Sequence, residues 1–259
     1  MQKMPPIWVI RLVLLVAFLA LWEFSSGPLI SPLFVSSPSA VVIVFWKWLV
    51  SGRLFYHAMI TVTEALSGFV IGGLIGMMAG VALGRSKMLA DILDPIIMIF
   101  YSLPKVALAP LFVMWFGIGI DMKIILTATV VFFLVFLNTY AGVRNVSREL
   151  IAILQLMQAQ NRHVLTKVIL PSAVSWVFTG LRLSVPYALI GAIVGELIAA
   201  NQGLGYLLSD SSGQFNTAGV FAALLAIVLL AMALNYAVKL LEKAVMPWRE
   251  EQEQREFSI

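Results

Sequence analysis

The stretch "GFVIGGLIGMMAGVALG", residues 68–84, places a glycine at every fourth position of an apolar run. The repeated positions are Gly68, Gly72, Gly76, Gly80 and Gly84, and Gly73 is one further glycine. In a soluble helix each interior glycine costs roughly 0.5–1 kcal/mol relative to alanine. Because residues four apart share one helix face, the spacing predicts a flat face that packs against a neighbouring helix. A glycine-rich loop is the alternative, but the residues between the glycines are all apolar.

The composition of the whole chain indicates that lipid surrounds this helix. Of 259 residues, 61% are hydrophobic and 12% are charged, whereas a soluble domain carries about 25% charged residues. Between lipid tails, helices associate through close packing, which small residues at four-residue spacing permit. The sequence therefore predicts an all-α membrane protein. The absence of cysteine and the wide separation of His57 and His163 give no disulfide and no metal site, and the net charge of +4 gives no case for nucleic acid.

Six segments are long and apolar enough to cross a bilayer, which takes about 20 residues. They cover residues 7–24, 61–84, 91–116, 124–143, 172–198 and 217–238. The first is interpreted as a retained anchor, because no small-x-small cleavage site follows it clearly. Pro104, Lys105 and Pro110 interrupt the third, and Arg182 and Pro186 lie inside the fifth. Residues 39–50 are expected to form a short interfacial helix.

The distribution of lysine and arginine predicts that both termini are cytoplasmic. With the N-terminus inside, three basic residues face outward, namely Lys47, Arg53 and Lys123. Twelve face the cytoplasm: Lys3, Arg11, Arg85, Lys87, Arg144, Arg148, Arg162, Lys167, Lys239, Lys243, Arg249 and Arg255. This excess follows the positive-inside rule.

One cytoplasmic segment is longer than the other loops. Residues 144–171, "RNVSRELIAILQLMQAQNRHVLTKVILP", carry apolar side chains at roughly helical spacing with polar residues between them. This pattern predicts two amphipathic helices at the inner membrane surface. They either lie on the membrane without a partner or bind a soluble protein.

Four stretches resemble the permeases of ABC importers, the binding-protein-dependent inner-membrane components. They are "TVTEALSGFVIGGLIG" (61–76), "LPKVALAPLFVMWFGIG" (103–119), "VILPSAVSWVFTGLRL" (168–183) and "VGELIAANQGLGYLL" (194–208). The resemblance is to the branch that imports nitrate, taurine and aliphatic sulfonates, and also pyrimidine or flavin-like nutrients. It implies a type I ABC importer permease fold in a bacterial inner membrane, and a protein that is not an enzyme.

The resemblance also implies partners and a division of the chain. The expected partners are a second permease copy in a homodimer, two ABC ATPase subunits that bind ATP-Mg, and an extracytoplasmic solute-binding protein. This chain itself would hold no cofactor. Residues 1–58 would form an anchor and an extracytoplasmic interfacial segment, residues 59–247 the permease domain, and residues 248–259 a cytoplasmic tail.

The family's cytoplasmic loop carries Glu-Ala-Ala, then a glycine, then Leu-Pro. Leu170 and Pro171 match its end, which places the glycine position at Gln158 and the glutamate position at Ala152. The acidic residue and the glycine are therefore both absent. The residues expected to couple to the ATPase are Ala152, Met157, Gln158, Ala159, Arg162, Leu170 and Pro171.

Charged residues at membrane depth are candidates for the transport pathway, because they are costly in lipid. Lys105 lies beside two prolines, where broken helices can line a cavity, and its charge would attract an anionic solute; pairing with Glu64 or Glu196 is the alternative. Arg182 either contacts solute or pairs with backbone carbonyls or a neighbouring helix. Glu64 and Glu196 fall near the outer ends of their spans, so the alternative to a role in the pathway is exposure at the membrane interface.

The candidate functions of such a chain fall into three classes. A self-sufficient secondary transporter or channel favours paired broken helices and midplane carboxylates, but only one broken span is found. A membrane enzyme needs clustered acids or histidines, and the chain offers none. No GxxxxGK[ST] nucleotide motif occurs, as expected for a permease driven by separate ATPases.

The expected solute is an anion of the nitrate, sulfonate or taurine type, followed by a thiamine-pyrimidine precursor or a riboflavin-like heterocycle. Residues 201–216 would meet the binding protein or form a solvated outer loop.

Overall fold

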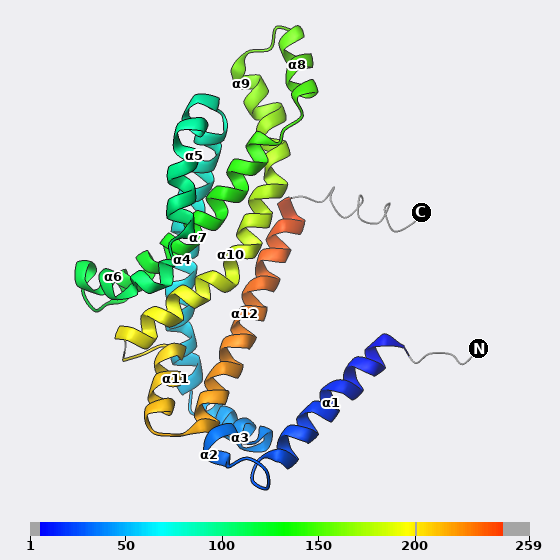
Figure 1. Cartoon of the computed structure of the whole chain (residues 1–259). Helices are drawn as coiled ribbons and strands as arrows, with labels where there is room; N and C mark the ends of the chain where they lie inside the picture. The colour runs from blue at the N-terminus through cyan, green and yellow to red at the C-terminus, as the bar shows by residue number, and fades with distance from the viewer. Residues whose placement is uncertain (1–5, 200, 246–259) are drawn as a thin grey trace.

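The computed structural model describes residues 6–199 and 201–245, which are almost entirely helical (Figure 1). The helices are α1 Ile7–Ser25, α2 Pro32–Val35, α3 Pro38–Val50, α4 Arg53–Gly84, α5 Lys87–Ser102, η1 Lys105–Leu108, α6 Ala109–Phe116, α7 Ile120–Arg144, α8 Arg148–Leu156, α9 Asn161–Val164, η2 Leu165–Ile169, α10 Leu170–Ala199, α11 Leu204–Gly213 and α12 Thr217–Val245. Lys3, Arg249, Arg255 and the expected tail 248–259 lie outside the described residues.

Five helices of the described chain are long and apolar enough to cross a membrane, and a bent pair makes six if the pair is one broken span rather than a re-entrant loop. The bent pair joins α5 to η1 and α6, with an angle of 73° at the break. The break falls where Pro104 forces Leu103 into an extended conformation, with ψ of 132°. The predicted interruption of the third segment is confirmed, and five or six apolar segments agree with the predicted all-α membrane fold.

Several helices are longer than the sequence predicts. Helix α4 begins at Arg53 rather than near residue 61, and it therefore contains the expected domain boundary at residues 58 and 59. Helix α7 begins at Ile120 rather than at residue 124. The placement of Lys123 in an outer loop is wrong, because this residue lies inside α7 with an exposed fraction of 3%.

Helix α7 lies at the centre of the bundle, between α4 and α10. The glycine face of α4 packs on it: a Cβ added at Gly76 would lie 2.7 Å from the Phe132 carbonyl oxygen, and one added at Gly80 would lie 2.7 Å from Thr139 Cβ. A Cβ added at Gly68, Gly72 or Gly84 would likewise overlap an atom of α7, in Thr127, Ala128 and Val143 respectively. From the other side, α10 brings its own glycines against α7, at Gly180, Gly191 and Gly195. Glycine therefore permits close approach on both sides of α7.

Short helices lie at both ends of the long ones, whereas α6 lies beside their middle (Figure 1). Helices α8 and α9 form one end, and α2, α3 and α11 form the other. Helix α1 runs away from the bundle and has no buried residue. The two ends therefore offer separate surfaces for partners.

We expect Gly72→Ala to destabilise the bundle, because its methyl group would overlap the backbone of Ala128 in α7. Overpacking of this kind costs typically 1–3 kcal/mol. Gly73→Ala is the matched control, since its methyl group would meet only the movable end of the Leu181 side chain at 3.3 Å. Thermal unfolding of both purified variants in detergent tests this difference, and equal melting temperatures would contradict the role of the glycine face.

Candidate functional site

Three ionisable side chains from three helices are enclosed together inside the bundle. Lys123 Nζ of α7 donates a hydrogen bond of 2.5 Å to Glu64 Oε1 of α4. Glu196 of α10 accepts from Thr61, which lies one turn before Glu64 on α4. Exposed fractions are 1% for Glu64 and Glu196 and 3% for Lys123. We call these three residues the buried charge cluster. The interfacial exposure considered for Glu64 and Glu196 is therefore wrong.

Glu196 also belongs to a set of contacts that fixes the start of α11. The first N–H groups of a helix have no partner within the helix. Here Gly203 N–H donates to His57 Nδ1 at 3.0 Å, Leu204 N–H to Thr61 Oγ1 at 2.8 Å, and Gly205 N–H to Glu196 Oε2 at 2.6 Å. Thr61 Oγ1 in turn donates to Glu196 Oε1 at 2.7 Å. We call these contacts the α11 attachment site.

Further contacts hold the segment 201–216 against the bundle. Arg53 pairs with Asp210 at 3.2 Å, and the Tyr56 hydroxyl donates to Gln202 Oε1 at 2.9 Å. Leu204 and Leu207 are fully buried. The segment is therefore a packed helix with short flanks, and the alternative of a solvated loop is wrong.

Arg182 of α10 forms an ion pair with Glu242 of α12. This is the neighbouring-helix alternative considered for Arg182. Sequence reasoning missed Glu242, because the sixth span was ended at residue 238, before this residue. The pair joins residues 60 positions apart, and only the packing of α10 against α12 brings them together.

Lys105 lies at the break between α5 and α6 and pairs with neither Glu64 nor Glu196, which corrects that alternative. Its Nζ donates to the Tyr101 carbonyl oxygen at 2.5 Å and lies 4.9 Å and 4.5 Å from the ring centroids of Tyr101 and Phe133. The side chain is only half-buried. A cation held by a carbonyl and two aromatic rings keeps its charge uncompensated by any carboxylate within the described chain.

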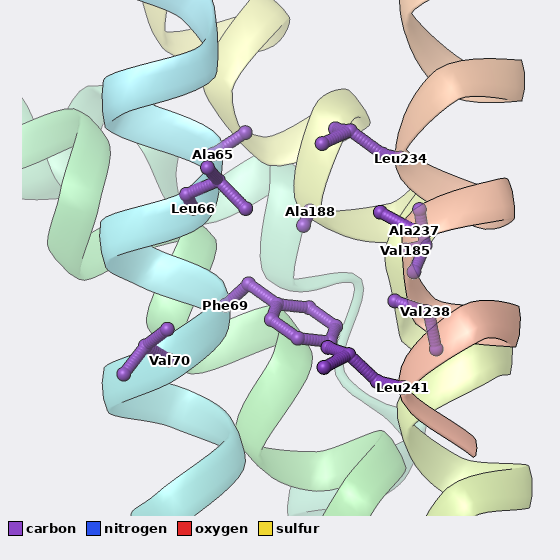
Figure 2. A pocket seen from close by; sticks show the side chains of 10 residues that line it. All are labelled: Ala65, Leu66, Phe69, Val70, Val185, Ala188, Leu234, Ala237, Val238 and Leu241. Atoms are coloured by element: carbon purple, nitrogen blue, oxygen red, sulfur yellow. The ribbon is translucent and has the colours of Figure 1, made fainter. Parts of the chain in front are cut away.

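The cavity in Figure 2 lies between α4, α10 and α12 and has a volume of about 160 Å³. Its lining side chains are all carbon, among them Phe69, Leu234 and Leu241. Such a surface offers no hydrogen-bond donor to a polar solute. Elsewhere in residues 6–199 and 201–245, no group of His, Cys, Asp or Glu side chains has the arrangement of a metal site.

The segment between α7 and α10 exposes apolar side chains at the end of the molecule. Leu156 and Met157 have exposed fractions of 84% and 72%, and none of the α8 side chains whose burial the structure describes is buried. Gln158 adopts the left-handed conformation with φ of 54°. A left-handed residue at this point gives the physical reason why the family pattern has glycine there.

The remaining residues expected to couple to the ATPase lie along the same segment. Ala152 and Arg162 are exposed, as are Leu170 and Pro171 at the start of α10, and Ala159 is half-buried. The structure thus places all seven between α8 and the first turn of α10, at the end of the molecule opposite α11 (Figure 1).

Comparison with known proteins gives the family and the fold. The family model described as "Binding-protein-dependent transport system inner membrane component" matches residues 72–247. The taurine transport system permease protein TauC of Escherichia coli (strain K12) is 32% identical, over 89% of this chain and 86% of TauC. The riboflavin transport system permease protein RibX of Chloroflexus aurantiacus is 34% identical, over 91% of this chain and 88% of RibX. Among solved structures, an inward-facing MetNI methionine ABC transporter matches with a TM-score of 0.60 at 20% identity, covering 77% of this chain and 97% of the other.

We expect Gly203→Ala to disrupt the α11 attachment site. Gly203 has a φ of +111°, and an added methyl group would overlap the Glu196 carboxyl group. Gly213→Ala, at the other end of α11, is the matched control, because nothing lies within 4 Å of its added methyl group. Limited proteolysis of the segment 201–216 in lipid nanodiscs measures the effect: cleavage should be faster in Gly203→Ala only, and unchanged cleavage in that variant would contradict the assignment.

Proposed function

Because this chain belongs to the family of binding-protein-dependent transport system inner membrane components, we propose that it is the subunit that passes a small solute into the cytoplasm when separate ATPases hydrolyse ATP. It is an ABC importer permease with the type I fold, and a multi-pass membrane protein rather than an enzyme. The single observation that carries the mechanism is the exposed apolar surface of α8, at the end of the long helices.

The ATPases dock on the segment from α8 to the start of α10. Leu156 and Met157 supply apolar contact, and the exposed Arg162, five positions after Met157, supplies a charge. Helix α9 continues through η2 into α10, so a movement of the docked segment is transmitted along a long helix to the membrane interior. ATP-Mg binds to these partner subunits and not to this chain.

The solute passes the break between α5 and α6, where Lys105 attracts it. An anion of the nitrate, sulfonate or taurine type fits this isolated cation, in keeping with the resemblance to TauC. The rings of Tyr101 and Phe133 around Lys105 favour a second candidate, a flat heterocycle that stacks on them, in keeping with the resemblance to RibX.

The assembly contains two copies of this chain in a bacterial inner membrane. Both termini and α8 face the cytoplasm, as the excess of lysine and arginine on that side indicates. The end formed by α3 and α11 then faces outward and receives the solute from the binding protein. The packing of α11 against α4 gives that protein a fixed surface.

Reconstitution tests the proposed function directly. Liposomes that contain this chain with the ATPase subunits facing the lumen, and the binding protein outside, should accumulate radiolabelled taurine or nitrate only when ATP is enclosed in the lumen. Liposomes with this chain alone should accumulate none. Uptake by this chain alone under an ion gradient would favour a secondary transporter and contradict the proposal.

We expect Arg162→Glu to weaken ATPase docking, because it reverses the charge of an exposed side chain within the docking segment. The measurement is co-purification of the ATPase subunits with the tagged permease. Lys47→Glu is the control, because Lys47 lies on α3 at the opposite end of the molecule. Equal recovery of ATPase from both variants argues against this placement of the docking segment.

We expect Lys105→Ala to reduce ATP-driven anion uptake roughly tenfold or more, since a hydrogen bond to a charged group contributes about 1.5–3 kcal/mol. Lys105→Arg, which keeps the charge, should retain more uptake than Lys105→Ala. Assembly with the ATPases should be normal in both variants. Normal uptake by Lys105→Ala would remove this lysine from the pathway.

A further inference from the structure

The buried charge cluster has unequal numbers of acidic and basic groups. Glu64 and Glu196 would carry two negative charges against the single positive charge of Lys123. All three side chains are at least 96% enclosed. An uncompensated charge in such surroundings is strongly unfavourable, so the cluster requires a further positive charge.

No neighbouring group within the described chain supplies that charge. His57 of α4 accepts a hydrogen bond at Nδ1 from Gly203 N–H, which makes its imidazole neutral. Arg53 of α4 is already paired with Asp210 of α11. Asp121, the other ionisable residue near the start of α7, is acidic and exposed.

The hydrogen bonds of the cluster leave one oxygen atom without a donor. Glu64 Oε1 accepts from Lys123, and the two oxygens of Glu196 accept from Thr61 and Gly205. Glu64 Oε2 is fully buried and has no donor among the described residues. Glu196 reaches the same place, because it accepts from Thr61, which lies one turn before Glu64 on α4, and because its neighbour Gly195 packs on Lys123. Two carboxylates repel each other, whereas a carboxylic acid donates a hydrogen bond to a carboxylate.

We propose that Glu64 and Glu196 share one bound proton, held between Glu64 Oε2 and the Glu196 carboxyl group. The proton gives the orphan oxygen its hydrogen bond and makes the cluster electrically neutral. It also leaves Glu196 free to accept from Thr61 and Gly205, so the α11 attachment site depends on it. This proton-binding site does not depend on the solute or on the ATPase contacts.

Infrared spectroscopy of the full-length chain in lipid nanodiscs near neutral pH tests the proposal. We expect the C=O stretching band of a protonated carboxyl group, at higher frequency than carboxylate bands and shifted downward in D₂O. The band should be lost in Glu64→Gln and also in Glu196→Gln, because the single remaining carboxylate then balances Lys123. It should persist in Asp121→Asn, the matched control. Absence of the band from the wild-type chain, or its survival in either glutamine variant, would overturn the sharing of a proton.

A charge-balance series gives a second readout that does not rely on the spectrum. Glu64→Gln keeps the Glu196 carboxylate as the acceptor from Thr61 and Gly205 and as the counter-charge of Lys123, so this variant should melt near the wild-type temperature. The double variant Glu64→Gln/Glu196→Gln leaves the lysine charge unpaired, so its melting temperature should fall. Adding Lys123→Met to the double variant should restore it. A double variant whose melting temperature does not rise when Lys123→Met is added would contradict the inferred balance.

Discussion

The close approach of α4 to α7 is the constraint on which the rest of the structure depends. Gly68 meets Thr127 with no room for a side chain. Glu64 lies one turn before Gly68, and Lys123 lies one turn before Thr127, so the same helix register joins their side chains at 2.5 Å. Gly195 packs against Lys123 from the other side, and its neighbour Glu196 completes the cluster. Glycine packing therefore determines where the buried charges meet.

The arrangement of charges separates those that hold the bundle together from those available to a solute. Glu64 forms an ion pair with Lys123, and Glu196 accepts a hydrogen bond from the backbone of α11. Arg182 forms an ion pair with Glu242. Each of these pairs joins two different helices, so they stabilise tertiary structure. Lys105 differs, because a carbonyl oxygen and two aromatic rings surround it. Of the four charged residues predicted to line a pathway, Lys105 alone, within the described chain, keeps a charge that no carboxylate neutralises.

Helical periodicity and apolar length were enough to predict the long apolar helices, the break near Pro104 and the short helix α3. They could not predict partners across helices, because Glu64 and Lys123 are 59 positions apart and Arg182 and Glu242 are 60 apart. Such pairs depend on the relative register of two helices, which no local pattern contains. Lys123 was misplaced for a related reason: its charge was interpreted as the end of a span, although a carboxylate inside the bundle compensates it. The resemblance aligned Gln158 with a glycine of the family pattern. The positive φ of Gln158 gives the reason, because glycine adopts this left-handed conformation most easily.

The separation of Glu64 from Lys123 along the chain has a consequence for biosynthesis. Helix α4 leaves the ribosome before α7 has been translated, so Glu64 reaches the translocon without its basic partner. A lone ionised glutamate is unfavourable in hydrocarbon. Until α7 is inserted, α4 is therefore more stable beside the translocon, or with Glu64 protonated, than alone in lipid with Glu64 ionised. Insertion of this protein is thus expected to be cooperative between helices rather than strictly sequential.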